Sequence, residues 1–221
     1  MTTKSAKTTT RPATRAAQDS RAAQDARAIP AAGAQDALST RDRLARAAAY
    51  LIHRRGYHGV GLSDVLARAG APKGVLYHHF PGGKPELAEA AIDFSAAVFN
   101  RQIDRAAAGA SSAAALIKAM GDLTADDLLQ TDYNAGCPLA TVALETAPND
   151  ERLSAACRRG FDLWLATMTR HLDRFGVDDA AGVAELTLSA LEGALALART
   201  RRSVDGVHAT AARLAAMVDG Y

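Results

Sequence analysis

Apolar side chains recur at intervals of three and four residues along most of this chain, the spacing that places them on one face of an α-helix. In the clearest case the run ends at Gly176, and its apolar members are Leu153, Cys157, Phe161, Trp164, Met168, Leu172 and Phe175. No segment alternates at an interval of two for long enough to predict a strand. Alanine, the strongest helix former, is abundant, and aromatic residues are scarce. The pattern therefore predicts an all-α fold.

Glycine, proline and capping residues divide this pattern into about nine helices. The first four are predicted to run from Ser39 or Thr40 to Gly56, over Leu62–Ala69, from Pro72 to Phe80, and from Pro85 onward. The fifth begins at Ser111 or Ser112, and the sixth follows Gly136 and Pro138 and ends at Pro148. The seventh contains the apolar run from Leu153 to Phe175 and is stopped by Gly176, and the last two cover about 179–201 and 205–218.

Charge is distributed unevenly along the chain. Residues 40–84 carry eight Lys or Arg against two Asp or Glu, whereas residues 85–221 carry twelve against nineteen. A compact basic module before an acidic body indicates that the module binds a polyanion. Residues 1–37 contain almost no apolar side chain larger than alanine, so we expect a disordered Ala/Arg-rich tail.

Two short predicted helices joined by a turn at Gly70 fit a helix-turn-helix at about residues 60–80. Val65, Leu66, Leu76 and Phe80 can form a small core beneath it. The outward side of the second helix then carries donors and a flat ring, at Lys73, Gly74, Tyr77, His78 and His79. Such groups suit phosphates and base edges, although a plain corner of a helical bundle is the alternative.

The stretch Gly70-Ala-Pro-Lys-Gly-Val-Leu-Tyr-His-His-Phe80, followed by Pro-Gly-Gly-Lys84, resembles the tetracycline-repressor (TetR) family. Gly136-Cys-Pro138 and Leu191-Glu-Gly-Ala194 are similar to its LmrA/YxaF-like branch. The resemblance implies a DNA-binding domain over 38–84 and a helical effector-binding and dimerisation domain over 85–221. The second short helix of the helix-turn-helix would enter the major groove of DNA.

The resemblance also implies roles for individual residues of the module. Lys73, Gly74 and Val75 match positions that touch base edges, and Tyr77, His79 and Lys84 match positions that hold phosphates. Two positions depart from the family pattern. Val75 stands where Ser or Thr is frequent, and Gly61 lies where a hydroxyl usually begins the preceding helix, so Ser63 is expected to substitute in part.

The segment 179–201 is apolar on two faces, whereas a surface helix needs only one. Val183, Leu186, Ala190 and Leu197 form one stripe, and a second stripe includes Leu188, Leu191 and Leu195. A central helix of a monomer would explain this, but the resemblance favours a homodimer, with its interface at Leu188, Leu191, Gly193, Ala194 and Leu195. The expected effector pocket is lined by Phe94, Met120, Tyr133, Cys137, Phe161, Trp164 and Met168.

The expected function is a cytoplasmic regulator of transcription, most simply a repressor that leaves a palindromic double-stranded DNA operator when a small effector binds. An activator and an adaptor without DNA binding are the alternatives. No nucleophile motif, phosphate-binding glycine loop or metal-ligand cluster predicts an enzyme, a metal or a cofactor. Glu185 and Glu192 interrupt the longest apolar run, so no membrane span is expected. Glu145, Asp126 and Asp127 could favour a cationic effector or could simply face water.

Overall fold

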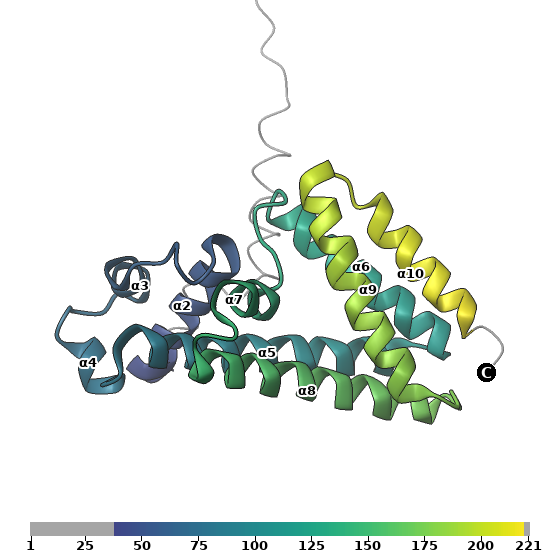
Figure 1. The fold of residues 1–221 in the computed structure, drawn as a ribbon, viewed down its shortest axis with the longest axis horizontal. Coiled ribbons are helices and arrows are strands. Elements are labelled where there is room, and N and C mark those ends of the chain that lie inside the picture. The colour runs from purple at the N-terminus through teal and green to yellow at the C-terminus, as the bar shows by residue number, and fades with distance from the viewer. Residues whose placement is uncertain (1–37, 219–221) are drawn as a thin grey trace, which may run out of the picture. The chain divides into compact units, whose positions relative to one another are not determined.

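The computed structural model describes residues 38–218, and this part of the chain contains nine α-helices and no strand (Figure 1). The helices are α2 (Thr40–Arg55), α3 (Leu62–Ala69), α4 (Val75–His79), α5 (Gly83–Gly109), α6 (Ala113–Gln130), α7 (Pro138–Thr146), α8 (Glu151–Arg174), α9 (Ala180–Arg201) and α10 (Asp205–Met217). The predicted all-α fold is confirmed. The tail predicted over 1–37 lies outside the described residues.

Local hydrogen bonds fix most helix ends where the sequence predicted them. The hydroxyl of Ser39 accepts from the backbone N–H of Asp42, and that of Ser112 accepts from Ala115. These bonds satisfy backbone donors that the first turn of a helix leaves unpaired. Gly56 ends α2 with a φ of 72°, a backbone conformation that suits glycine.

Two starts differ from the prediction. The helix α4 begins at Val75, because Pro72–Gly74 form a tight turn in which the Val75 N–H donates to the Pro72 carbonyl, 3.1 Å away and three residues back. The helix α5 begins at Gly83, two residues before Pro85, since the Glu86 carboxylate accepts from the Gly82 N–H at 2.7 Å. The predicted domain boundary at residue 84 therefore falls inside a continuous helix.

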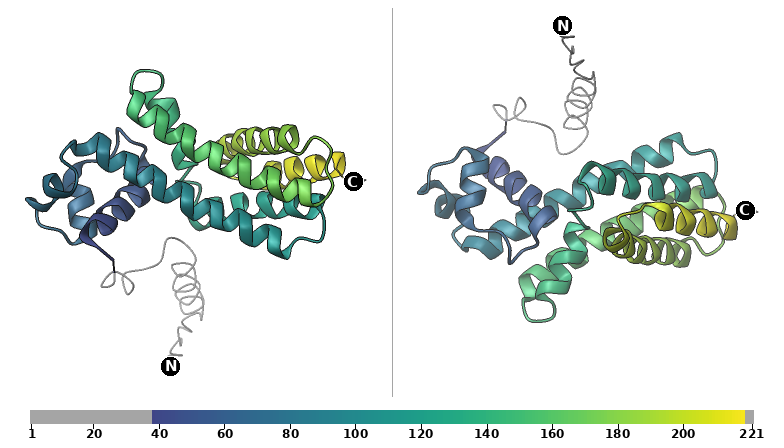
Figure 2. Two further views of the ribbon diagram at one scale, coloured as in Figure 1. Left: turned by 90° about the horizontal axis from the view of Figure 1, so that it is seen from below. Right: turned by 90° about the horizontal axis from the view of Figure 1, so that it is seen from above.

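The small core beneath the helix-turn-helix forms as predicted. Val65, Leu66, Leu76 and Phe80 are all buried, and Leu44 of α2 joins them. The helix α2 packs against α3, α4 and the first turns of α5. The two short helices α3 and α4 are therefore held on α2, which itself packs against α5 (Figure 2).

The remaining helices form the body. The helices α5 and α8 run side by side in the same direction (Figure 1). Ion pairs connect them, between Glu89 and Arg159 near one end and between Asp104 and Arg170 farther along. The helices α6, α9 and α10 pack on one another beside them. A Cβ at Gly121 of α6 would lie only 2.5 Å from the Ala211 Cβ of α10, so this glycine permits close helix packing.

Candidate nucleic-acid interface

The helix α4 separates its buried and exposed residues clearly. Leu76 and Phe80 point into the core, while Tyr77 has 62% of its surface exposed. Lys73, Gly74 and His78 are also exposed. The structure thus brings a flat ring, a cation and an imidazole together on one outward edge. That edge offers the donors and the flat surface with which a helix contacts phosphates and bases in a groove.

The ring of Tyr77 is positioned by the start of α5. A Cβ built on Gly83 would lie 3.6 Å from Tyr77 Cε1, so the ring packs beside this glycine. Gly83 has a φ of 68°, which side chains other than glycine rarely adopt. The Phe-Pro-Gly-Gly-Lys turn therefore both begins α5 and sets the place of the tyrosine.

Lys84 lies on the other side of this turn. Its ammonium nitrogen is 4.5 Å from the centre of the Tyr57 ring, a cation–π contact that limits the positions of a flexible side chain. Tyr57 itself is buried, and burial, with the Asp150 carboxylate as a second cause, raises the pKa of its hydroxyl. The predicted phosphate contact of Lys84 would start from this held position.

Two other predicted DNA contacts lie in different surroundings. Val75 is half-buried and packs against the core, so its side chain is partly occupied by folding. His79 is half-buried beside His78, with ring centres 5.0 Å apart. At the start of α3 no side chain caps the helix at Gly61, and Ser63 is exposed in the first turn. The role of each remains a prediction.

Several arginines of the module are held by aromatic rings or by a carboxylate. The guanidinium of Arg41 lies over the Phe80 ring at 4.9 Å, and that of Arg68 lies 3.2 Å from the Tyr50 ring centre. Arg55 forms an ion pair with Asp64 at 3.0 Å. Stacking on aromatic rings holds the charged groups of Arg41 and Arg68 without removing their charge. The module therefore combines a fixed helix edge with a positive surface.

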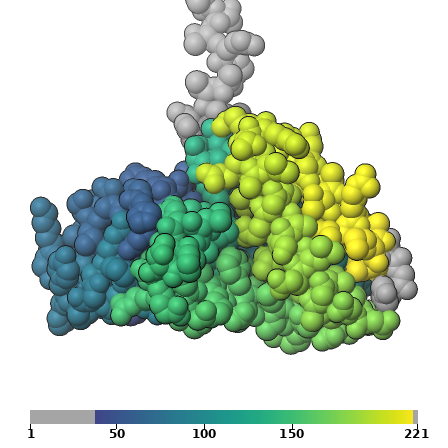
Figure 3. Space-filling model, in the orientation of Figure 1, coloured from purple at the N-terminus to yellow at the C-terminus, as the bar shows by residue number. Residues whose placement is uncertain are grey.

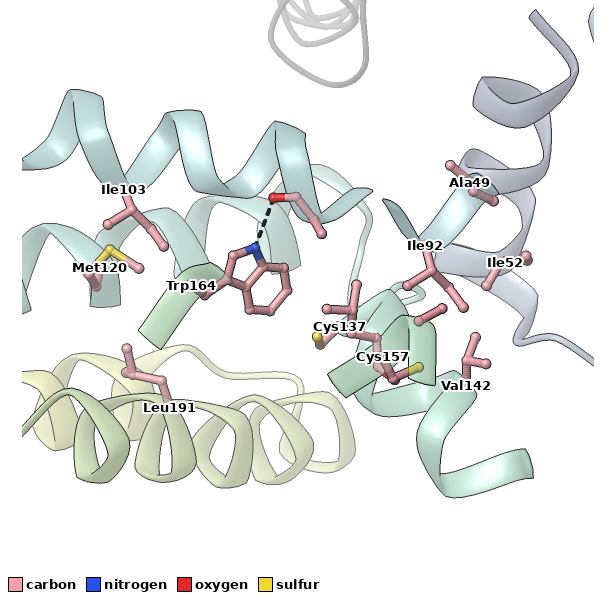
Figure 4. Close-up of a cluster of buried hydrophobic side chains, with 14 of the residues drawn as sticks. Ala49, Ile52, Ile92, Ile103, Met120, Cys137, Val142, Cys157, Trp164 and Leu191 are labelled. Atoms are coloured by element: carbon pink, nitrogen blue, oxygen red, sulfur yellow. Dashed lines mark hydrogen bonds between the residues drawn. The ribbon is translucent and has the colours of Figure 1, made fainter. Parts of the chain in front are cut away.

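The predicted effector-pocket residues are mostly core. Met120, Cys137 and Trp164 are buried in the core that Figure 4 shows. Met168 is buried as well, whereas Phe94, Tyr133 and Phe161 are half-buried against the same core. The indole N–H of Trp164 donates to the Ala96 carbonyl of α5 at 2.9 Å. The Trp164 ring also contacts those of Phe99 and Phe161, at centre distances of 4.7 and 5.6 Å. These side chains are packed against one another, and their contact with an effector remains a prediction.

Sequence reasoning missed one polar residue of this core. The carboxyl group of Glu192 on α9 lies against the thiol of Cys137, and burial raises the pKa of both groups. Cys137 also caps α7, since its sulfur accepts from the Ala140 N–H at 3.4 Å. The sequence did mark Glu192, because this acidic residue lies inside the longest apolar run. There it served only as an argument against a membrane span.

The residues predicted for the dimer interface lie on different faces of α9. Leu191 and Ala194 are buried against the chain's own body, Leu188 and Leu195 are half-buried, and only Gly193 is exposed. The role of these residues in a dimer remains a prediction. The other stripe is open: Leu186 and Leu197 have 43% and 53% of their surface exposed. In the space-filling view α9 lies across the outer face beside α10 (Figure 3).

Two family models match the chain. One, described as bacterial regulatory proteins of the tetR family, covers residues 44–91, and one, described as the LmrA/YxaF-like transcriptional regulator C-terminal domain, covers 113–213. The uncharacterized HTH-type transcriptional regulator Rv0196 of Mycobacterium tuberculosis is 38% identical over 171 residues, which span 74% of this chain and 86% of that protein. The chain belongs to the TetR family.

Further relatives agree with this placement. The uncharacterized HTH-type transcriptional regulator YxaF of Bacillus subtilis is 32% identical over 164 residues, covering 73% of this chain and 86% of that protein. A TetR transcriptional regulator of known structure from Chloroflexus aurantiacus has a TM-score of 0.67 and 28% identity, covering 82% of this chain and 94% of that one. The predicted LmrA/YxaF-like branch is thereby confirmed, and this TetR-family protein is a DNA-binding regulator rather than an enzyme.

The helix α9 is the one helix within residues 38–218 that is long and apolar enough to cross a membrane. Core helices of soluble proteins can be equally long and apolar, and α9 packs against α6, α8 and α10. Only 28% of its most apolar window is buried inside the chain. In this TetR-family protein, the feature to explain is therefore an apolar helix with one uncovered face.

Proposed function

We propose that the protein is a dimeric repressor that binds a palindromic operator through α4 of each subunit and is released by a small effector. The observation that carries the proposal is the outward edge of α4, where Tyr77, His78 and Lys73 stand exposed over a buried core. The ring of Tyr77 packs beside Gly83 at one edge only and leaves most of its surface open. It suits the major groove, into which the second helix of a helix-turn-helix is inserted.

The uncovered face of α9 supports the dimer. Leu186 and Leu197 expose apolar surface at residues 11 apart, three turns along one helix, and Met217 of α10 is 64% exposed. Gly182, Ser189 and Gly193 lie exposed between or beside them and allow another helix to approach closely. A two-fold contact through α9 and α10 would cover this surface and present two copies of α4 to one side of a DNA duplex.

The helix α5 supports release by an effector. It packs against α2 of the DNA-binding domain and against α8 of the body. An effector that separates Trp164 from Ala96 would therefore displace a helix that continues into the DNA-binding domain. Such an effector shifts the equilibrium between the DNA-binding and the released conformation only as far as its affinities for these two conformations differ. Since the target is chromosomal DNA, we place the protein in the cytoplasm.

Selection of bound DNA from a random pool tests the DNA-binding and dimer proposals together. A two-fold symmetric dimer is expected to select a palindrome with half-sites about 10 base pairs apart or a multiple of that spacing. Lys73→Ala and Tyr77→Ala should weaken binding to the selected sequence, while Lys118→Ala, which removes an exposed cation on α6, should not. Recovery of no enriched sequence, or of one without symmetry, would contradict the proposal.

Repression and release need a second measurement. A promoter carrying the selected palindrome should be less active when the protein is present, and an effector should restore it while lowering operator affinity in vitro. An increase in promoter activity would instead identify an activator. An effector that binds the body but leaves operator affinity unchanged at fixed salt would exclude the mechanism through α5.

A further inference from the structure

Two carboxylates reach from the body to the C-terminal end of α2. Asp127 of α6 accepts from His53 Nε2 at 3.1 Å, and Glu145 of α7 accepts from the backbone N–H of His58 at 2.8 Å. The backbone N–H of Gly136 donates to the His53 carbonyl at 3.3 Å. The DNA-binding domain therefore has polar connections to the body that do not pass through α5. We call these three bonds the α2 clamp.

The chain is shaped locally to accept Glu145. A Cβ at Gly56 would overlap the Glu145 carboxylate, and the φ of 72° at this residue also favours glycine. Gly56 is thus required both to end α2 and to admit the carboxylate. The hydrogen bond to His58 then fixes the turn that leads into α3 and the helix-turn-helix.

The body side of the clamp is also held. Between α6 and α7, Asp132 and Tyr133 both adopt left-handed backbone conformations, with φ of 51° and 59°. Arg202, which follows α9, forms an ion pair with the Asp132 carboxylate at 2.6 Å, and Arg199 donates to the Tyr133 carbonyl at 3.4 Å. Consecutive left-handed residues other than glycine persist only where their surroundings hold them. The end of α9 therefore supports the loop that contacts α2.

Apolar contacts alone would not fix the position of α2. Val142 of α7 lies with Ile52 and Ile92 in the core between the two parts (Figure 4). Apolar contacts are non-directional and tolerate sliding, whereas hydrogen bonds weaken steeply when their geometry changes. Because α4 lies at the far end of this domain, a small rotation of α2 would move the DNA-contacting edge by a larger distance.

We propose that Asp127 and Glu145 are positioning residues that set the placement of the helix-turn-helix on the body, and so the spacing of the two α4 helices on DNA. This inference rests on the proposed dimeric operator complex. Each base pair added to the centre of a palindrome moves one half-site by about 3.4 Å and turns it by about 34°. A dimer whose DNA-binding domains are held firmly on the body should bind a palindrome of altered centre length weakly. A dimer whose domains are held loosely should bind it nearly as well as the original.

The experiment measures binding to a series of DNA duplexes. The palindrome selected from the random pool is prepared with its centre unchanged, and shortened or lengthened by one or two base pairs, together with a duplex carrying a single half-site. The intact protein is compared with Asp127→Ala, Glu145→Ala and the double variant. Asp126→Ala is the matched control, since it removes an exposed carboxylate from the adjacent position of α6. Glu145→Gln tests rescue, because its amide oxygen can still accept from His58.

The intact protein is expected to prefer one centre length strongly. The double variant should lose about fivefold or more of that preference, as the loss of two hydrogen bonds implies, while its affinity for the single half-site stays the same. Asp126→Ala and Glu145→Gln should behave like the intact protein. Circular dichroism of each variant checks that its helices are intact.

Two results would overturn the inference. One is an unchanged centre-length preference in a folded double variant. The other is an equal loss of affinity for the single half-site, which would assign these carboxylates to folding of the helix-turn-helix. If the intact protein binds no palindrome, the proposed function itself fails, and the inference fails with it.

Discussion

The uncovered face of α9 makes a quantitative prediction about Leu197. Full burial of a leucine side chain stabilises by about 1.5–3 kcal/mol, and Leu197 has 53% of its surface still exposed in the single chain. Covering the remainder would contribute about 1 kcal/mol per subunit. A two-fold interface counts this contact twice, so Leu197→Ala is expected to weaken the dimer by about 2 kcal/mol, or roughly 30-fold in the dissociation constant.

Sedimentation velocity over a dilution series measures this constant directly. Leu144→Ala is the matched control, because Leu144 is 87% exposed on α7 and would lose apolar surface without touching the proposed interface. The thermal stability of the Leu197 variant should change little at protein concentrations that keep it dimeric. Equal dissociation constants for the intact protein and the Leu197→Ala variant would refute the assignment of this face.

Three further predictions concern DNA binding, the core and the thiols. Lys84→Ala should reduce the slope of log affinity against log salt concentration by about 0.9 without changing the selected sequence, as expected for one lost phosphate contact; an altered sequence would indicate base reading. Trp164→Phe removes the hydrogen bond to Ala96 and should lower the free energy of unfolding by about 1 kcal/mol in denaturant titration, whereas no change would show that the bond is weak. Burial raises the pKa of Cys157 to about 11 and that of Cys137 well above its usual range, so both thiols stay protonated at pH 8. A thiol reagent should label neither until the protein is unfolded, and fast labelling of the native protein would contradict their burial.

Helix ends were predictable because they depend on neighbouring residues. Ser39, Ser112 and Gly56 act on backbone groups within four positions, and the structure places helix ends at all three. The start of α4 was not predictable from the same rule. Pro72 suits the first turn of a helix, but here its carbonyl accepts the bond of a tight turn, and the regular helix follows only at Val75.

The interface on α9 illustrates what periodicity alone leaves undecided. Two apolar stripes were visible in the sequence, one with Leu186 and Leu197, the other with Leu191 and Leu195. Neighbouring residues do not indicate which stripe faces the core. Packing against α6 and α8 decides it, because Leu191 is buried there while Leu186 and Leu197 remain open. Family resemblance pointed to this helix for the proposed contact but gave no information about its orientation.

The acidic residues of the body show the same dependence on tertiary structure. From the sequence, Asp126, Asp127 and Glu145 could equally favour a cationic effector or face water. His53 and Asp127 are 74 positions apart, and His58 and Glu145 are 87 apart, so only the packing of α2 on α6 and α7 reveals these pairs. One carboxylate of the Asp126–Asp127 pair contacts the DNA-binding domain, and its neighbour faces solvent.

The DNA-binding domain is joined to the body in two ways, by the continuous helix α5 and by the hydrogen bonds of the α2 clamp. This arrangement has a consequence for release from DNA. The helix α5 has 27 residues and spans about 40 Å, so it transmits a displacement from the body as a stiff rod. If the α2 clamp holds while α5 moves, the helix-turn-helix must rotate about the C-terminal end of α2 rather than follow α5 as a whole. Such a rotation changes the separation of the two α4 helices while each α4 edge stays intact. An effector would then abolish binding to the palindrome and leave binding to a single half-site unchanged, whereas melting of the helix-turn-helix would abolish both.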